Sequence, residues 1–287
     1  LLFNKVMTEN LGLDDPYELV LSGAWTFDKF AEMARAAILD VNGDGTFDKV
    51  DNYGYVGGAN MLLMNFVTAS RSRTIERTED GARVALLSNT RIADVCEKVA
   101  NTVFETGFWY TKSESSNDYY LTDTFFQDDQ ALFADHTFYS ACRLRDMASD
   151  FGIIPFPKYD ESQESYGSVA EAGSRITTVP AVVKDAEMVG AVLEMMHYLS
   201  YRDVMPAYYE TTLKQKVSRD SVSAQMLDLI LDNVYYDLGA TMFNEAIKDG
   251  ILWQYLIGSR TDYASRVEAK MQSIEKAITD AGGVVAQ

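Results

Sequence analysis

The sequence predicts an α/β protein with room for two lobes, and three observations carry this prediction. The chain has 287 residues, a size at which a single hydrophobic core stops growing and division into lobes becomes favourable. Hydrophobic residues make up 47% of it and aromatic residues 12%, enough to bury a large core. Short strand patterns alternate with helical patterns in the first part of the chain, whereas nearly everything after Lys184 has helical spacing. We therefore expect a helix-rich C-terminal half.

Residues 1–40 fit a helix, a turn and a second helix. The segment FNKVMTENLGL has helical spacing and ends at Gly12, and DDPYELVLSG begins a second turn with Pro16 just inside it. In TFDKFAEMARAAIL, Thr26 can cap the following helix, because its hydroxyl can accept a hydrogen bond from a free amide of the first turn. The buried face of that helix would consist of Phe27, Phe30, Met33, Ala34 and Ala37.

Strands and helices alternate over the middle of the chain. We expect a short strand in NYGYVGG, a buried helix over 60–70, and a hairpin in RTIERTEDGARVALLS closed at Asp80 and Gly81. Residues 90–110 fit an amphipathic helix, and DDQALFADHTFYSACRLRDM predicts a strand that gives way to a helix around Tyr139. Further strands are expected in DFGIIPFPKYD and SRITTVPAVV. The helices expected after these strands are 184–202, 205–216, 221–233, 240–257 and 262–281.

The composition excludes several kinds of partner. With 43 acidic and 25 basic residues the net charge is −18, which repels nucleic acid and anionic membrane surfaces. We therefore expect no nucleic-acid partner and a soluble monomer. Cys96 and Cys142 have no metal-binding spacing; two free thiols are expected, although a single bridge between them stays open.

The segment DVNGDGTFDKVD, residues 40–51, spaces its oxygen-bearing side chains as a calcium-binding loop does. It matches the pattern D-x-[DN]-x-[DN]-G-x5-E except that Asp replaces the last Glu, and Gly45 stands at the sharp turn. The expected ligands are Asp40, Asn42, Asp44, the Thr46 carbonyl, Asp48 and Asp51. Because the closing Asp is one methylene short and the loop is single, we expect a structural Ca²⁺ ion and not a sensor. The alternative is a solvated acidic turn.

Four segments in order resemble the extracellular solute-binding proteins of ABC transporters, specifically the carbohydrate-type family 1 proteins. They are FNKVMTENLGLDDPYELVLSGAWTFDKFAEMA, DQALFADHTFYSACRLRDM, DFGIIPFPKYD and ITTVPAVVKDAEMVGAVLEMMHYLS. The resemblance covers essentially the whole chain, but the family's first lobe-forming stretch is missing ahead of Leu1. We expect the natural sequence to begin upstream, since LLFNKVMTEN also lacks the features of a secretion signal.

The resemblance implies a periplasmic-binding-protein-like fold of type II, in which two α/β lobes joined by crossover strands close on a ligand in the cleft. Residues 1–150 and 204–287 would form the larger, C-terminal-type lobe. Residues 151–203 would cross to the other lobe and return. The family also implies ABC transporter permease subunits as partners and an extracellular or cell-surface location, with a lipid anchor in the full-length protein.

Sugar sites combine flat aromatic faces with amide, carboxylate and guanidinium groups that take the hydroxyls. The segments that match the family's cleft positions contain Asn60, Phe138, Tyr139, Ser174, Arg175, Trp253 and Tyr255. Arg175 would come from the opposing lobe, with Ser174 beside it. For each aromatic residue the alternative is packing in the core.

Motifs for catalysis are missing from the sequence. His136 and His197 have no nucleophile at a recognised spacing, and there is no G-x-S-x-G or phosphate-binding glycine loop. We therefore expect a binding protein that captures a sugar or oligosaccharide and performs no chemistry. Two alternatives stay open: a secreted carbohydrate-active enzyme, since paired carboxylates exist among so many acids, and a calcium-stabilised protein-interaction module.

Overall fold

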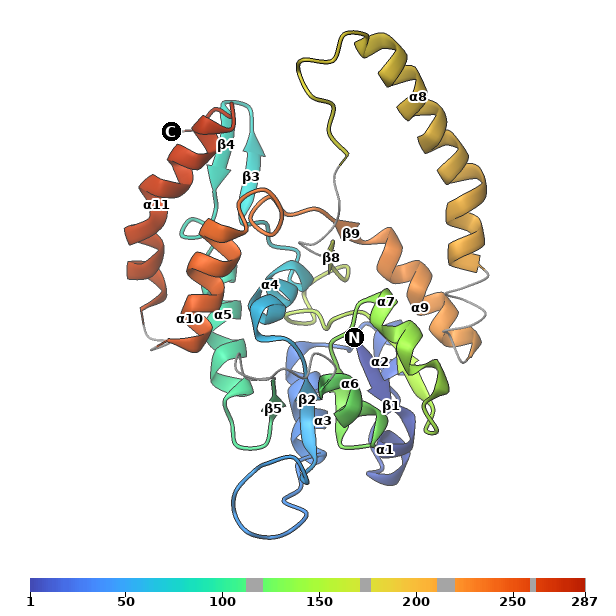
Figure 1. The fold of residues 1–287 in the computed structure, drawn as a ribbon. Helices are drawn as coiled ribbons and strands as arrows, with labels where there is room; N and C mark the ends of the chain where they lie inside the picture. The colour runs from blue at the N-terminus through green and yellow to red at the C-terminus, as the bar shows by residue number, and fades with distance from the viewer. Residues whose placement is uncertain (112–120, 171–176, 211–219, 259–261, 287) are drawn as a thin grey trace.

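A computed structural model describes residues 1–111, 121–170, 177–210, 220–258 and 262–286 (Figure 1). Most of these residues form one packed body, and a single long helix stands away from it. Both the alternation of strands and helices and the helix-rich C-terminal half agree with the sequence prediction of an α/β chain.

A five-stranded sheet in the order β5-β2-β6-β1-β7 forms the centre of the body. Strands β5, β2 and β6 are parallel, while β1 is antiparallel to both of its neighbours, β6 and β7. The register sets Tyr55 opposite Phe133 and Val56 opposite Ala134. The strand bounds are β1 Leu2–Asn4, β2 Tyr53–Val56, β5 Trp109–Tyr110, β6 Ala131–Ala134 and β7 Phe151–Ile153.

Three capped helices precede the acidic loop. They are α1 Lys5–Asn10, α2 Pro16–Ser22 and α3 Phe27–Ala36. The side chains of Asn4, Asp15 and Thr26 accept hydrogen bonds from first-turn amides, and the Thr26 cap was expected. The predicted buried face of α3 is confirmed, since each of its five residues is at most 3% exposed.

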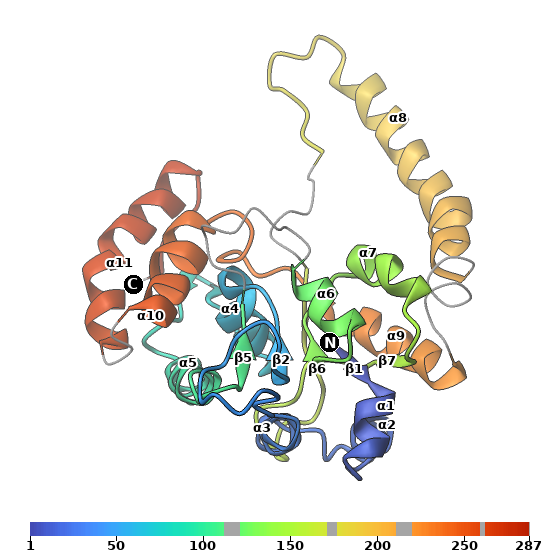
Figure 2. The same ribbon diagram turned by 60° about the horizontal axis from the view of Figure 1, so that its bottom comes forward.

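Helices cover both faces of the sheet (Figure 2). On one face α3, α4 Ala59–Ala69 and α5 Thr90–Val103 pack around a group of rings in which Phe30 lies 5.1 Å from Phe133 and 5.6 Å from Tyr55. On the other face a second apolar cluster contains residues of α6, α7, η1 and α9. Their bounds are α6 Leu121–Gln127, α7 Phe138–Ala141, η1 Cys142–Asp146 and α9 Ser221–Asp232. The sheet is therefore the middle layer of three.

A smaller layer lies beyond α4 and α5. The predicted hairpin is confirmed as β3 Ile75–Thr78 and β4 Gly81–Val84. Because Thr78 pairs with Gly81, its turn consists of Glu79 and Asp80, one residue ahead of the predicted Asp80 and Gly81. Helix α11 packs against β4 and against η4, a π-helical segment that also packs on α4. These C-terminal elements are η4 Glu245–Trp253, α10 Gln254–Ile257 and α11 Tyr263–Asp280.

The chain leaves the body after the short strand β8 and has returned to it at α9, ahead of the short strand β9. Strand β8 Ser168–Val169 pairs with β9 Val234–Tyr235, and between them the chain runs out through α8 Ala186–Leu199 and the π-helical turn η2 Ser200–Val204. No residue of α8 is buried, and Figures 1 and 2 both show the helix standing clear of the body.

Several element predictions were wrong in detail. The helix expected over 90–110 ends at Val103, because the chain turns at Gly107 (φ +74°) and carries Phe108 into the core. Residues 177–183, the described part of SRITTVPAVV, form no strand, since no described strand lies beside them to complete a ladder. The helix expected from residue 240 begins at Glu245.

Both cysteines are free thiols, which settles the alternative left open by the sequence. Cys96 is fully buried, and burial raises the pKa of its thiol well above the ordinary value. Within the described ranges, none of the helices combines the length and the apolar character needed to span a bilayer.

Candidate functional site

Three parallel strands end side by side at one edge of the sheet, which is where open α/β sheets bind ligands. Two loop segments leave the strands and run into helices. Residues 57–60 follow β2 and include the first two residues of α4, and residues 135–139 follow β6 and include the first two residues of α7. The two loops are joined to the strands beside them, since the Asp135 amide donates to the Val56 carbonyl over 2.9 Å and the Gly57 amide donates to the Tyr110 carbonyl over 3.2 Å. We call these two loops together the carboxyl edge.

Polar side chains support the carboxyl edge from below. Asn65 on α4 donates from Nδ2 to Oδ2 of Asp135 over 2.8 Å. Tyr55 is fully buried; burial, together with the Asp135 carboxylate, raises the pKa of its phenol well above the ordinary value. A Cβ atom at Gly57 would stand 2.6 Å from the Tyr55 hydroxyl and 2.9 Å from Cβ of Asp135, so only glycine permits this close approach.

An exposed tyrosine stands at the start of α7. Thr137 caps this helix by accepting from the Ser140 amide, and the ring of the next residue but one, Tyr139, is 74% exposed. The guanidinium carbon of Arg143 lies 5.7 Å from that ring. Arg143 is held in turn by the buried carboxylate of Asp123, with Nη2 at 2.7 Å and Nε at 2.8 Å from Oδ2. The ion pair of Arg143 with Asp123 thus holds a guanidinium group beside the exposed ring of Tyr139.

His136 belongs to the same loop but is enclosed. Its side chain is 4% exposed, with Nδ1 3.5 Å from Oδ1 of Asp123. Burial lowers the pKa of His136 to about 4, against the opposing effect of Asp123, so the imidazole is neutral at neutral pH. An enclosed, neutral histidine cannot exchange protons with a ligand at this edge, in keeping with the structural role usual for an isolated histidine.

The structure brings three of the predicted ligand-binding residues together. Asn60, Phe138 and Tyr139 all lie on the carboxyl edge; Asn60 and Tyr139 are exposed, and Phe138 is half-buried. Trp253 is half-exposed on η4, which packs against α4. Tyr255 is 2% exposed in the core, with its ring edge-on to Tyr263 at 5.5 Å, so the structure does not bring it to this edge.

Ser174 and Arg175 lie outside the described residues. Three residues at or beside the carboxyl edge were not predicted from the sequence: Asn65, Trp109 and Asp135. Asp135 could have been found, because polar residues that directly follow a buried strand are typical of such an edge. Trp109 is half-buried and donates from Nε1 to the Gly57 carbonyl over 3.3 Å, a contact that depends on the pairing of two-residue β5 with β2.

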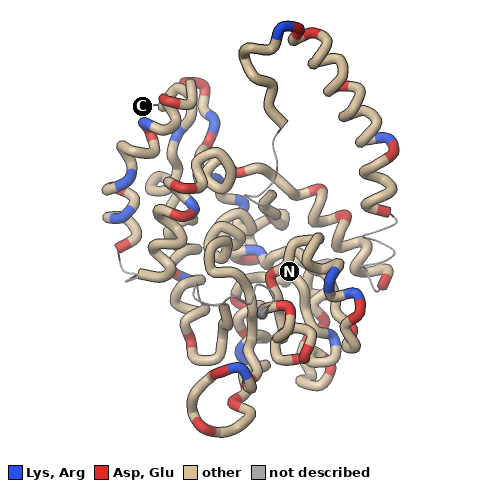
Figure 3. Tube along the Cα trace, viewed as in Figure 1, with Lys and Arg blue, Asp and Glu red and all other residues tan. Residues whose placement is uncertain are grey.

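The acidic loop projects from the opposite end of β2 (Figures 1 and 3). Its side chains accept hydrogen bonds from its own backbone: Asp40 from the Gly43 and Gly45 amides, and Asp44 from the Thr46 amide over 2.7 Å. Asp51 is fully buried and accepts from the amides of Val41 and Asp48, each over 2.8 Å. Nowhere in the described ranges are three or more His, Cys, Asp or Glu side chains grouped as a metal site. Calcium binding by Asp40, Asn42, Asp44, Thr46, Asp48 and Asp51 stays a prediction.

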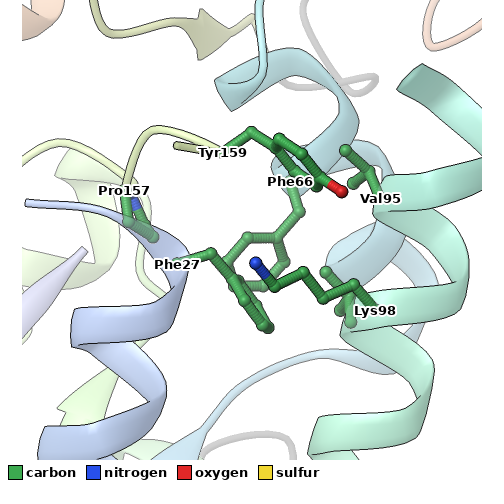
Figure 4. A pocket seen from close by; sticks show the side chains of 7 residues that line it. Phe27, Phe66, Val95, Lys98, Pro157 and Tyr159 are labelled. Atoms are coloured by element: carbon green, nitrogen blue, oxygen red, sulfur yellow. The ribbon is translucent and has the colours of Figure 1, made fainter. Parts of the chain in front are cut away.

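Two hollows lie away from the carboxyl edge. One is a cavity of 10 Å³ between α3, α4 and α5, room for about one water molecule, and the Lys98 ammonium lies 4.9 Å from the Tyr159 ring and 5.5 Å from the Phe27 ring (Figure 4). The other is a groove of 240 Å³ beside α1 and α2, at the end of β1 remote from the carboxyl edge. The small cavity has no space for a sugar.

Several solved structures are similar in fold to this chain. The maltose/maltodextrin-binding domain MalE from Bdellovibrio bacteriovorus, bound to maltotriose, matches with a TM-score of 0.62 at 18% identity, over 97% of this chain and 70% of that one. The ABC substrate-binding protein Lmo0181 from Listeria monocytogenes, in complex with cycloalternan, matches with a TM-score of 0.60 at 10% identity, over 97% and 69%. Apo RafE from Streptococcus pneumoniae matches with a TM-score of 0.58 at 16% identity, over 96% and 69%.

This chain has the fold of the ABC-transporter solute-binding proteins. The solute-binding-protein fold is of the periplasmic-binding-protein-like type II, as the sequence resemblance predicted. No protein-family model and no curated protein sequence matches the chain.

Proposed function

We propose that this protein is the solute-binding component of an ABC import system, and that it binds a sugar or oligosaccharide at the carboxyl edge. The observation that carries the proposal is the juxtaposition at this edge of an exposed aromatic face, Tyr139, with the amide of Asn60 and the half-buried rings of Phe138 and Trp109. Such a set can stack on the C–H surface of a sugar ring and bond its hydroxyl groups.

The fold supports the same proposal. Solved proteins with this fold include complexes with maltotriose, raffinose and cycloalternan. From this fold we infer three further properties. The protein delivers its ligand to permease subunits, it lies outside the cytoplasm, and it binds the ligand without chemical turnover. The division into residues 1–150 with 204–287 and residues 151–203 remains a prediction. What supports a crossover of this kind is the excursion through α8, which begins after β8 and ends where α9 packs on the body.

Calorimetric titration of the parent protein with maltotriose and with raffinose tests the proposal. Tyr139→Ala should weaken the affinity for the sugar that binds by about two- to tenfold, since stacking on an aromatic ring contributes about 0.5–1.5 kcal/mol beyond area burial. Tyr139→Phe keeps the ring and should retain most of the affinity. Leu21→Ala, at a site on α2 that is 57% exposed, is the control for an ordinary surface change.

Equal affinities of Tyr139→Ala and the parent would remove Tyr139 from the site. The same samples, analysed for oligosaccharide cleavage, test the enzyme alternative. Release of shorter sugars by the parent would favour that alternative over simple binding.

A further inference from the structure

Helix α4 ends on an arginine at a position where α1, α2 and α11 end on glycine and α6 ends on Asp129. The amide of Arg71 donates to the Thr68 carbonyl over 2.9 Å and the amide of Ser72 donates to the Val67 carbonyl over 3.3 Å, which is the Schellman arrangement. This arrangement holds Arg71 at φ +62°, in the left-handed region. At the ends of α1, α2 and α11 the residues with positive φ are Gly12, Gly23 and Gly282. The end of α6 has Asp129 at φ +58°, and its carboxylate is used, since it accepts hydrogen bonds from Asn4 and Ser149.

The helix stop therefore explains the backbone at this position but not the side chain. Glycine adopts the left-handed region at no steric cost, and a residue with a Cβ atom does not. A residue kept at a strained backbone position is a reason to look for a use of its side chain. The guanidinium group is the charged part of this side chain, and its surroundings indicate such a use.

A second arginine, two residues on, points to the same place. The guanidinium carbons of Arg71 and Arg73 lie 5.5 Å and 4.6 Å from the centroid of a single ring, that of Tyr235 on β9. Both arginines are exposed. In the part of the chain that the structure describes, neither guanidinium has a carboxylate within ion-pair distance or a hydrogen-bond acceptor.

Buried and partly buried hydrogen bonds hold residues 70–73, the loop that contains the two arginines. Ser70 and Ser72, which alternate with them, are buried and bonded to each other, Oγ to Oγ, over 3.0 Å. The Tyr235 hydroxyl donates to the carbonyls of Thr68 and Ser72, at 3.1 Å and 2.8 Å. The loop and the ring are thus fixed relative to each other before any ligand arrives, which reduces the entropy lost on binding.

The carboxylate of Asp237, close to Tyr235 in the sequence, is already engaged. Asp237 is 1% exposed, and its oxygens accept from the amide and hydroxyl of Thr74 and from the amides of Gly239 and Ala240. It lies two residues after Tyr235 and stabilises the loop at Thr74, with no ion pair to either arginine. The guanidinium groups of Arg71 and Arg73 therefore place two positive charges at the Tyr235 ring, where one anion can contact both. They do so on a protein whose net charge is −18.

We propose that Arg71, Arg73 and Tyr235 form a binding site for the oxyanion group of a small solute, a carboxylate or a phosphate. The forked guanidinium groups match the paired oxygens of such groups, and the fixed ring holds the two forks side by side. The site is built from the end of α4 and from β9, so it is separate from the carboxyl edge at the start of α4.

The decisive variant is Arg71→Gly, measured by isothermal titration with inorganic phosphate, glucuronate and neutral glucose at low salt. The parent should bind one anion and bind it more weakly as salt rises. Arg71→Gly should lower the affinity tenfold or more while the melting temperature stays equal or rises, because glycine relieves the left-handed backbone. Arg73→Gln should weaken the anion to a similar degree.

The matched control is Arg77→Gln, at an exposed arginine of β3 that lies over no ring in the described structure. It changes the net charge as Arg73→Gln does and should leave the affinity within twofold of the parent. Binding of phosphate and glucuronate alike supports a general oxyanion site, and binding of glucuronate alone supports a site for sugar acids.

A parent that binds neither anion, or anion affinity that falls as much in Arg77→Gln as in Arg71→Gly, overturns the proposal. Neutral-sugar affinity, measured in parallel, should be unchanged in all three variants. Loss of anion binding and failure of the proposed sugar site are therefore separate results.

Discussion

The two ends of strand β2 carry loops of opposite character. The acidic loop at its amino end, residues 40–51, bonds mainly to itself, through carboxylates that accept amides a few residues away. The carboxyl edge at its other end depends on distant partners: Asn65 on α4 bonds Asp135 after β6, and Trp109 on β5 bonds Gly57. A local motif can be recognised in the sequence because the residues that bond to one another are close along the chain. A site at a sheet edge is assembled by strand pairing, and pairing has no local signature.

The largest expected effect is on the free energy of unfolding, which should fall on acidification because of His136 on the carboxyl edge. His136 on the carboxyl edge has a pKa lowered to about 4 by burial, against an ordinary value of 6.5, so the unfolded state takes up its proton first. As pH falls from about 6.5 to about 4, the free energy of unfolding should drop by up to about 3 kcal/mol, since each pKa unit corresponds to about 1.4 kcal/mol. Urea unfolding at a series of pH values measures this drop.

His136→Gln is the control, because it removes the titrating group and should flatten the curve in this window. A parent and a variant with the same pH dependence between 6.5 and 4 would show that the histidine is not held neutral by its burial.

A methyl group added at Gly57 should lower the free energy of unfolding by less than the protonation of His136 does. It should lower it by more than a methyl group added at an exposed glycine. At Gly57→Ala the new Cβ would meet the Tyr55 hydroxyl at 2.6 Å, and we expect a loss of about 1–3 kcal/mol in the free energy of unfolding. Gly190→Ala on exposed α8 has nothing within 4 Å and should be neutral or stabilising by about 0.5–1 kcal/mol. Denaturant unfolding compares the two, and equal effects would mean that the edge is not closely packed.

The smallest expected effect concerns the acidic loop. If Asp40, Asn42, Asp44, Thr46, Asp48 and Asp51 bind calcium, an ion concentration ten times the dissociation constant should stabilise the protein by about 1.4 kcal/mol. Asp44→Ala should abolish this gain, whereas Asp14→Ala, at an exposed aspartate outside the loop, should retain it. Thermal melts with calcium and with a chelator measure the difference. A parent indifferent to calcium would leave the loop as a solvated turn closed by Asp51.

Elements with local determinants were predicted well. The Thr26 cap, the end of the first helix ahead of Gly12 and the buried face of α3 depend on neighbours within a few residues, and the structure contains all three. The hairpin is also present, with its turn one residue ahead of the predicted place. Errors arose where a distant partner decided the outcome. The helix predicted through residue 110 stops at Val103 because Phe108 has a place in the core.

For the candidate site, the sequence alone determined which segments matter, since the loops that contain Asn60 and Phe138–Tyr139 stand out by their residues and their order along the chain. Only the tertiary structure decided that these loops meet, that Asp135, Asn65 and Trp109 join them, and that Tyr255 is enclosed in the core. The physical reason is the range of the interactions. Caps, turns and amphipathic faces are settled within one or two turns of chain, whereas the edge of a sheet and the exposure of a ring depend on which distant strands and helices pack together.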